Sequence, residues 1–323
     1  MQHRRRILRQ GAALAAAAAF GPVLAADAFP SRALTLYVSF GPGGVGDIVA
    51  RIVAEQLAKS LGQAVVVENR PIPVMGPTLV AKARPDGYTM VVSGNGTAVT
   101  AALFNTLSFD IMRDFTHVST MASFDMALIA PADSKFNSLA DALTFARANP
   151  GKLNIGSARV GSTQNLAAEM LRAMAGIDVV LVPYKAPGDI IAALHSNDIQ
   201  LALEHLPAVR SQINAKNVKA LAVTSAMRFS GLPQVPTIGE SGVPGFEATS
   251  WLGISVPAHT PQPVVDRLAK AVQAVVTTPQ VRKALQAASI EPESSTPQQM
   301  TERMSNDLAK WRAVIDKAGI PKQ

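Results

Sequence analysis

The chain has 323 residues, of which 48% are hydrophobic, 16% charged and 5% aromatic, and it contains no cysteine. These values are typical of a protein with a large buried core, and they exclude disulfides, thiolate metal sites and cysteine nucleophiles. The length allows two domains. The formal net charge is +7, but no basic cluster lies beyond the N-terminal segment, so nucleic-acid binding is not expected.

The first 28 residues are typical of an export signal. A basic start from Arg4 to Arg9 precedes a short apolar run (11–20), and small residues follow near a cleavage point at 25–28. The run is too short to span a bilayer comfortably, so a cleaved signal and a periplasmic protein are favoured over an uncleaved anchor. Paired arginines leave both the twin-arginine and the general export route open.

Strand-like and helix-like segments then alternate. Strands are predicted over 33–40, 63–69 and 88–94, with helices over 46–62 and 76–87. This β-α-β-α-β order implies a parallel sheet with crossover helices. The pattern restarts at 126–132 and continues to 225, with predicted helices beginning at Ser138 and at Ser162 or Thr163. A proline- and glycine-rich passage (231–253) and a helical tail (263–319) follow. The sequence therefore predicts an α/β protein with two lobes and a cleft.

A glycine-rich loop follows the first predicted strand. Gly41, Gly43 and Gly46 fit the dinucleotide pattern G-x-G-x-x-G, but Asp47 occupies the first helical turn, where a pyrophosphate would bind. No P-loop lysine follows, so a nucleotide site is not expected. Two interpretations remain: the backbone N–H groups of the loop hold one carboxylate, or the glycines only form a tight turn.

A second loop of similar design precedes the helix that starts at Ser162 or Thr163. Gly161, Ser162 and Thr163 offer N–H and O–H donors at a helix N-terminus, although capping is their alternative use. The segment 93–97 follows the third strand and is expected beside the first loop. Ligands of open α/β sheets bind beyond the carboxyl ends of strands, so two such loops, one per lobe, are expected to face each other across the cleft.

Signals for catalysis are missing. No G-x-S-x-G motif occurs, and the histidines lack metal-binding spacing. Neither an enzyme, a metal site nor a cofactor is therefore expected. Asp178, Asp189 and Asp198 lie where solvated turns are predicted, and Trp251 is interpreted as a packing residue. The four histidines of the mature chain are His117, His195, His205 and His259.

Several long segments resemble the Bug family, the extracytoplasmic solute receptors of tripartite tricarboxylate transporters. The similar segments are "FGPGGVGDIVARIVAEQLAKSLGQAVVVENRP", "RPDGYTMVVSGNGT", "GSTQNLAAEML", "VPYKAPGDIIAAL" and "VKALAVTSAMRFSGLPQVPTIGESGVPGFEATSWLGISVPAHTP". The resemblance covers nearly all of residues 30–323. It implies a type II periplasmic-binding-protein fold whose two lobes close on a small organic acid without catalysis.

The resemblance also implies which residues hold the ligand and which partners exist. A monomer that delivers its ligand to the membrane subunits of a tripartite tricarboxylate transporter is expected. Alternatives are a ligand-sensing partner of a membrane sensor or an exported two-lobed enzyme. The implied lobes are 29–128 plus 251–323 for lobe one and 129–250 for lobe two. The implied ligand-binding residues are Gly43, Gly44, Asp47, Ser93, Asn95, Thr97, Gly161, Ser162, Thr163, Tyr184, Lys185 and Glu204.

Three departures from the family pattern concern this site. Residues 72–78 read "IPVMGPT" where the family has a glycine-rich stretch, Asn165 stands where histidine is frequent, and Glu204 replaces an aspartate. The longer Glu204 side chain is expected to shrink the cavity or shift a bridging water. The identity of the ligand therefore cannot be inherited from relatives.

Overall fold

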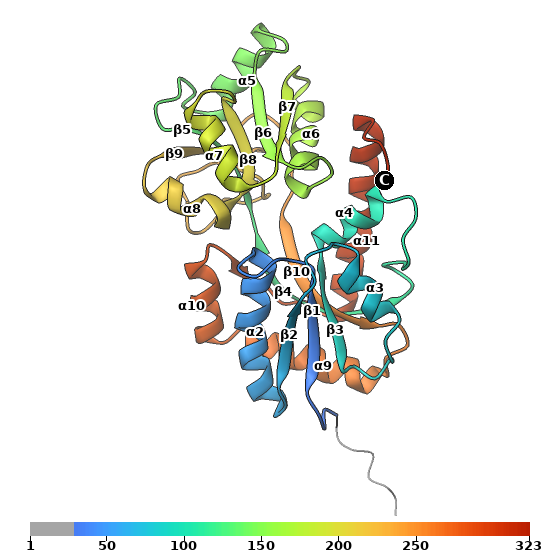
Figure 1. The fold of residues 1–323 in the computed structure, drawn as a ribbon. Coiled ribbons are helices and arrows are strands. Elements are labelled where there is room, and N and C mark those ends of the chain that lie inside the picture. Colours follow the sequence, from blue (N-terminus) through green and yellow to red (C-terminus); the bar gives the residue numbers. More distant parts are fainter. Residues whose placement is uncertain (1–28) are drawn as a thin grey trace, which may run out of the picture.

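The computed structural model describes residues 29–323, so the export signal predicted for residues 1–28 lies outside the described part. Two lobes follow one another along the long axis of the molecule, and each is built around its own β-sheet (Figure 1). The expectation of an α/β protein with two lobes is confirmed. No helix among residues 29–323 is both long and apolar enough to cross a bilayer.

Lobe one contains a six-stranded mixed sheet in the order β11-β4-β10-β3-β1-β2. β1 pairs in parallel with β2 and β3, whereas β10 is antiparallel to β3 and β4. The strands are β1 (Leu34–Val38), β2 (Val65–Asn69), β3 (Thr89–Gly94), β4 (Phe115–Phe124), β10 (Ser250–Pro257) and β11 (Glu291–Pro292). The helices on its two faces are α2 (Val45–Leu61), α3 (Met75–Ala81), α4 (Asn95–Leu103), α9 (Gln262–Val276), α10 (Pro279–Ala287) and α11 (Pro297–Ala318).

Lobe two contains a five-stranded sheet in the order β7-β6-β8-β5-β9. β6 pairs in parallel with β7 and β8, and β5 runs antiparallel to both β8 and β9. The strands are β5 (Met126–Pro131), β6 (Asn154–Ala158), β7 (Val180–Tyr184), β8 (Leu201–His205) and β9 (Val218–Val223). The helices are α5 (Leu139–Ala148), α6 (Thr163–Ala175), α7 (Pro187–His195) and α8 (Leu206–Asn214).

The chain passes between the lobes twice. It leaves the first sheet after Phe124 and enters the second at Met126, and it returns through residues 224–249 into β10. The expected boundary between the lobes, after residue 128, lies inside β5. Asp125, the single residue between β4 and β5, is three residues earlier. The apolar run on both sides of Asp125 contains no glycine or proline, so the sequence carries no turn signal there.

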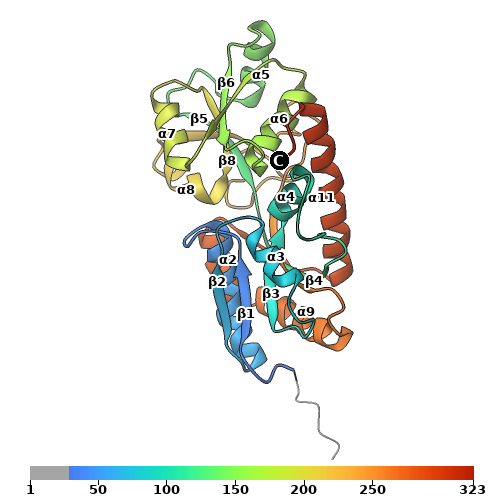
Figure 2. The same cartoon turned by 45° about the vertical axis from the view of Figure 1, so that its right-hand side comes forward.

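One side of the junction is filled by an apolar core that both lobes share. α11 extends along lobe one and continues beside α6 of lobe two (Figure 2). Leu103 of α4, Leu166 of α6 and Trp311 of α11 belong to one buried cluster. Separating the lobes on this side would expose that cluster to water, so any opening motion is expected to pivot here.

Local sequence signals explain how the helices begin. The Ser138 hydroxyl accepts a hydrogen bond from the Asp141 N–H (3.1 Å), and the Asp141 carboxylate accepts one from the Ser138 N–H. Ser162, rather than Thr163, caps α6, because its hydroxyl accepts from the Asn165 N–H. Gly62 ends α2 in the left-handed conformation that glycine adopts without strain.

Five elements were not expected from the sequence: β4, α4, α8, β10 and the short β11. β10 begins inside the passage that was interpreted as a proline- and glycine-rich return between the lobes. β4 was missed because buried polar residues, including His117 and Ser119, interrupt its hydrophobic pattern. α4 begins with "NGT" directly after β3, which is typical of a loop. α8 follows β8 with no connecting residue, so one apolar run contains both elements.

Candidate functional site

The first glycine loop is closed by its own residues. The Gly43 N–H donates to Asp47 Oδ2 (2.9 Å), and the Gly44 N–H donates to the Gly41 carbonyl (3.0 Å). The resemblance assigned Gly43 and Gly44 to the ligand; in this structure both N–H groups have acceptors inside the loop, and their contact with a ligand stays a prediction. The groups that a helix start leaves unpaired are the next N–H groups, at the first turn of α2.

Asp47 holds this loop together through the hydrogen bonds that its carboxylate accepts. Its Oδ1 accepts from Arg51 Nε (2.9 Å) and Asn69 Nδ2 (2.8 Å), while Oδ2 takes the Gly43 N–H. Burial raises the pKa of the Asp47 carboxyl, but the hydrogen bonds from Arg51, Gly43 and Asn69 outweigh it and leave the pKa lowered. Asp47 therefore stabilises the loop, and its expected role as a ligand contact stays a prediction.

Replacing Asp47 with alanine is expected to lower the free energy of unfolding by about 1–3 kcal/mol, because three donors lose their acceptor. Urea unfolding measures this loss. Glu55→Ala is the matched control on the same helix, because the Glu55–Lys59 pair (3.0 Å) is exposed and should contribute less than about 1 kcal/mol. Equal losses in the two variants would show that Asp47 does not stabilise the loop.

The side chains of Ser93 and Thr97, both expected in the ligand wall, form hydrogen bonds within lobe one. Ser93 is buried, and its hydroxyl contacts Ser255 (2.5 Å), which in turn contacts His117 Nδ1 (2.8 Å). Burial lowers the pKa of His117 to about 4. Ser93 therefore belongs to a polar network inside lobe one, and its place in the ligand wall stays a prediction. Thr97 is half-buried and its hydroxyl accepts from the Gly94 N–H (3.2 Å).

The second loop meets lobe one directly. Thr163 Oγ1 donates to Asn95 Oδ1 across the junction (3.0 Å), so two residues expected in the site are brought together. Gly161 has φ +75°, and an added Cβ would lie 2.4 Å from Leu103 Cδ2 of α4. The Gly161 N–H donates to Asn165 Oδ1 (3.1 Å), so this glycine N–H is also engaged within its own loop.

Two further predicted residues lie at the same end of the second sheet. Tyr184 pairs with Ala158, which leads into the second loop, and burial raises the pKa of the Tyr184 phenol. Lys185 is exposed and forms no ion pair with residues 29–323. Both therefore lie beside the end of β6, from which the chain leads toward α6, and their contact with a ligand stays a prediction from the resemblance.

Glu204 is buried below the first turn of α6. Its Oε1 accepts from Gln164 Nε2 (2.8 Å) and from the His205 N–H (2.6 Å), whereas Oε2 has no partner among the described residues. Burial raises the pKa of this carboxyl, which favours its neutral form. Glu204 thus connects the end of β8 to the start of α6, a role that the sequence did not indicate.

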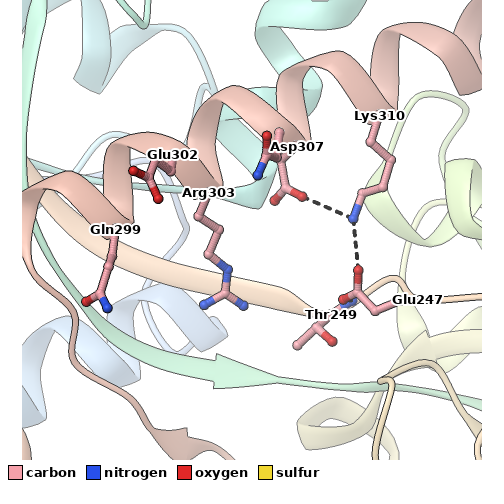
Figure 3. A pocket seen from close by; sticks show the side chains of 8 residues that line it. Glu247, Thr249, Gln299, Glu302, Arg303, Asp307 and Lys310 are labelled. Carbon is pink, nitrogen blue, oxygen red and sulfur yellow. Dashed lines mark hydrogen bonds and ion pairs between the residues drawn. The ribbon is translucent and has the colours of Figure 1, made fainter.

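Two hollows in the described part of the chain lie along α11, away from both glycine loops. One, of about 450 Å³, lies between α11 and the segment before β10; Figure 3 shows Lys310 there between Glu247 (3.3 Å) and Asp307 (3.0 Å). The other, of about 600 Å³, lies between α6 and α11. Neither was expected. One feature of the sequence could have indicated the first hollow. Asp307 is an acidic residue on the same helix face as the buried Met304, Leu308 and Trp311, where an apolar residue would be expected.

Metal chemistry finds no support in the described part of the chain. Residues 29–323 contain no group of three or more histidine, aspartate or glutamate side chains placed to hold a metal ion. Trp251 is buried, and the expectation that it packs in the interior is confirmed.

Comparisons with known proteins identify relatives along the whole chain. A UPF0065 protein of Pseudomonas sp. (strain P51) is 36% identical over 315 residues, which cover 97% of this chain and 94% of the relative. BugT of Bordetella pertussis is 30% identical over 313 residues, 96% of each chain. Both relatives therefore match nearly the whole length of this chain.

Solved structures share the fold. An R. palustris protein solved with adipate has 33% identity and a TM-score of 0.79, covering 91% of this chain and 99% of that chain. The periplasmic binding protein BugD has 31% identity and a TM-score of 0.76, covering 91% and 100%. MatC from Rhodopseudomonas palustris with bound malate has 28% identity and a TM-score of 0.74, covering 89% and 100%.

These neighbours confirm the resemblance to Bug proteins, the binding-protein fold and the expectation of a non-enzymatic solute receptor. The family model matches residues 49–320, most of the described chain. The chain belongs to the tripartite tricarboxylate transporter receptor family.

Proposed function

We propose that the protein is a periplasmic receptor that binds a small carboxylate at the lobe junction and delivers it to a tripartite tricarboxylate-type membrane transporter. Family membership supports the receptor role, and relatives solved with adipate and malate support a carboxylate ligand. The observation that carries the proposal is the direct contact between the starts of α6 and α4, Thr163 to Asn95, because two helix N-termini there favour an anion.

The chemistry around α6 also favours an anion. Ser162 accepts the capping bond through its oxygen, and its proton has no acceptor among the described residues. Arg159, in the same loop, is exposed and forms no ion pair within residues 29–323. A free hydroxyl proton, a guanidinium and the first N–H groups of a helix together can hold one carboxylate. No sequence motif had singled out Arg159.

A thermal-shift screen of the chain from residue 29 onward tests the proposal. The panel contains adipate, malate, succinate and citrate, and the control is adipamide, which has no charged carboxylate. A binding acid at about 100 times its dissociation constant should add roughly 2.7 kcal/mol of stability. Stabilisation by adipamide equal to that by adipate would argue against carboxylate recognition. Capture of transporter membrane subunits only with ligand present would support delivery.

Ser162→Ala is expected to weaken binding of the acid by about 1–3 kcal/mol, up to roughly a hundredfold, because a hydroxyl donor to a charged group is lost. Calorimetry with the strongest acid of the screen measures this change. Thr144→Ala is a control, since the Thr144 hydroxyl bonds its own helix at Ala140 (2.8 Å) and lies on α5. Unchanged affinity in Ser162→Ala would remove this hydroxyl from the site.

A further inference from the structure

Four buried polar side chains from four elements form one chain of hydrogen bonds across the lobe junction. Thr163 Oγ1 of α6 donates to Asn95 Oδ1 of α4 (3.0 Å), and Asn95 Nδ2 donates to Asp307 Oδ2 of α11 (3.2 Å). Trp251 Nε1 of β10 donates to the same Asp307 oxygen (2.7 Å). The four side chains are at most 8% exposed, so water does not compete with these bonds.

The chemistry of Trp251 and Asp307 decides which group donates and which accepts in each of these hydrogen bonds. An indole N–H only donates and a carboxylate only accepts, so Asp307 must face the NH₂ group of Asn95. The Asn95 carbonyl oxygen then points to α6, and the Thr163 hydroxyl has to donate to it. The Thr163 proton is therefore committed to the contact between the lobes and is not available to a ligand carboxylate.

We propose that Asp307 is a positioning residue for the ligand site. Asp307 orients Asn95, so that Thr163 forms a contact between the lobes and fixes the position of the start of α6. The ligand carboxylate is then bound by the Ser162 hydroxyl and the first N–H groups of α6. This inference rests on the proposed function for its ligand, whereas the chain of hydrogen bonds belongs to the ligand-free protein. Lys310 contacts the other Asp307 oxygen at the wall of the polar hollow (3.0 Å).

The first test needs no ligand. The protein has two tryptophans, so its indole ¹⁵N–¹H spectrum should show one resonance each for Trp251 and Trp311, assigned with Trp311→Phe. Thr163→Val, which removes the hydroxyl, is expected to shift the Trp251 resonance through Asn95 and Asp307. Thr163→Ser keeps the hydroxyl and Ser162→Ala leaves the chain intact, so both should leave the resonance in place. An unmoved Trp251 resonance in Thr163→Val overturns the proposal.

The second test is a double-mutant cycle on affinity, with adipate and malate as probes. Thr163→Val and Asp307→Asn are each expected to weaken binding three- to tenfold, and the double variant should be no weaker than the worse single variant. Ser162→Ala combined with Asp307→Asn should instead multiply the two losses, as independent contacts do. Multiplying losses for Thr163 and Asp307 would place Thr163 on the ligand and overturn the proposal.

The two tests separate this inference from the proposed function. If neither acid binds, the carboxylate receptor fails while the Trp251 resonance still decides whether Asp307 and Thr163 are linked. If Asp307→Asn does not fold, the comparison of Thr163→Val with Thr163→Ser decides alone, because these two substitutions keep the side chain close to its original size. A shift with valine and none with serine supports the link, and equal spectra overturn it.

Discussion

Gly161→Ala is expected to lower the free energy of unfolding by about 2–4 kcal/mol and to weaken ligand binding. The left-handed φ of +75° costs an alanine about 1 kcal/mol. The new Cβ would also lie 2.4 Å from Leu103 Cδ2, and Leu103 is 2% exposed, so it can yield only by disturbing the shared core. Overpacking of this kind costs typically about 1–3 kcal/mol.

Gly176→Ala provides a matched control at the other end of α6. Gly176 also has a left-handed φ (+60°), but nothing lies within 4 Å of its implied Cβ. Its loss of stability should therefore be about 1 kcal/mol, from backbone strain alone. Urea unfolding of both variants isolates the overlap with Leu103. Equal losses would mean that α6 and α4 are not in close contact at Gly161.

The affinity of Gly161→Ala for the ligand tests whether the contact between Gly161 and Leu103 also matters for binding. Any shift that relieves the overlap moves the start of α6 away from α4, and with it Ser162 and the first N–H groups of the helix. We therefore expect at least a roughly tenfold loss in affinity for the acid, with Gly176→Ala close to wild type. Wild-type affinity in Gly161→Ala would separate the ligand site from this junction.

The fold could be predicted from the sequence because its signals are local. Apolar runs, Ser138 and Ser162 as caps, and Gly62 as a helix end each act within a few residues. β4 and α8 were missed for local reasons as well, since the first mixes buried polar residues with apolar ones and the second follows β8 without a break. The crossing at Asp125 gave no turn signal at all.

The site was harder to predict because its partners are distant in sequence. Asn95 and Asp307 are 212 residues apart, and Ser93 and Ser255 are 162 apart. Sequence reasoning placed the second loop at the lobe junction but could not identify the acceptors of the donors in either loop, such as Asp47 for the Gly43 N–H. Residue type shows that a group can bind a carboxylate, whereas only packing shows whether another residue already occupies it.

The crossing from β4 to β5 carries a carboxyl whose ionisation opposes folding. Asp125 is 5% exposed, and its carboxylate accepts from the Ser225 hydroxyl (2.8 Å). Burial raises the pKa of Asp125 to about 6; the Ser225 bond works against this, while Glu291 and Glu247 raise it further. The folded protein therefore binds this proton more tightly than the unfolded chain, whose aspartates titrate near pH ~3.9.

Asp125→Asn is consequently expected to stabilise the protein above pH 6 by about 2–3 kcal/mol, since a shift of about two pKa units corresponds to roughly that energy. In the wild type the stabilising contribution of this proton is complete below about pH 4 and is lost as pH rises through about 6. His117 and His205, whose pKa values burial lowers to about 4, produce the opposite slope between pH 4 and 6.5.

The informative quantity is therefore the difference in unfolding free energy between Asp125→Asn and wild type, in which both histidine contributions cancel. Urea unfolding from about pH 4 to 8 should show this difference rising toward pH 6 and then levelling. The reason is that the introduced amide cannot ionise between Glu247 and Glu291, while its carbonyl oxygen still accepts from Ser225. Ser134→Ala, on the loop after β5, should give a difference that does not vary with pH. A flat difference for Asp125→Asn would mean that Asp125 is solvated at the crossing, and that no charge resists burial where the lobes are joined.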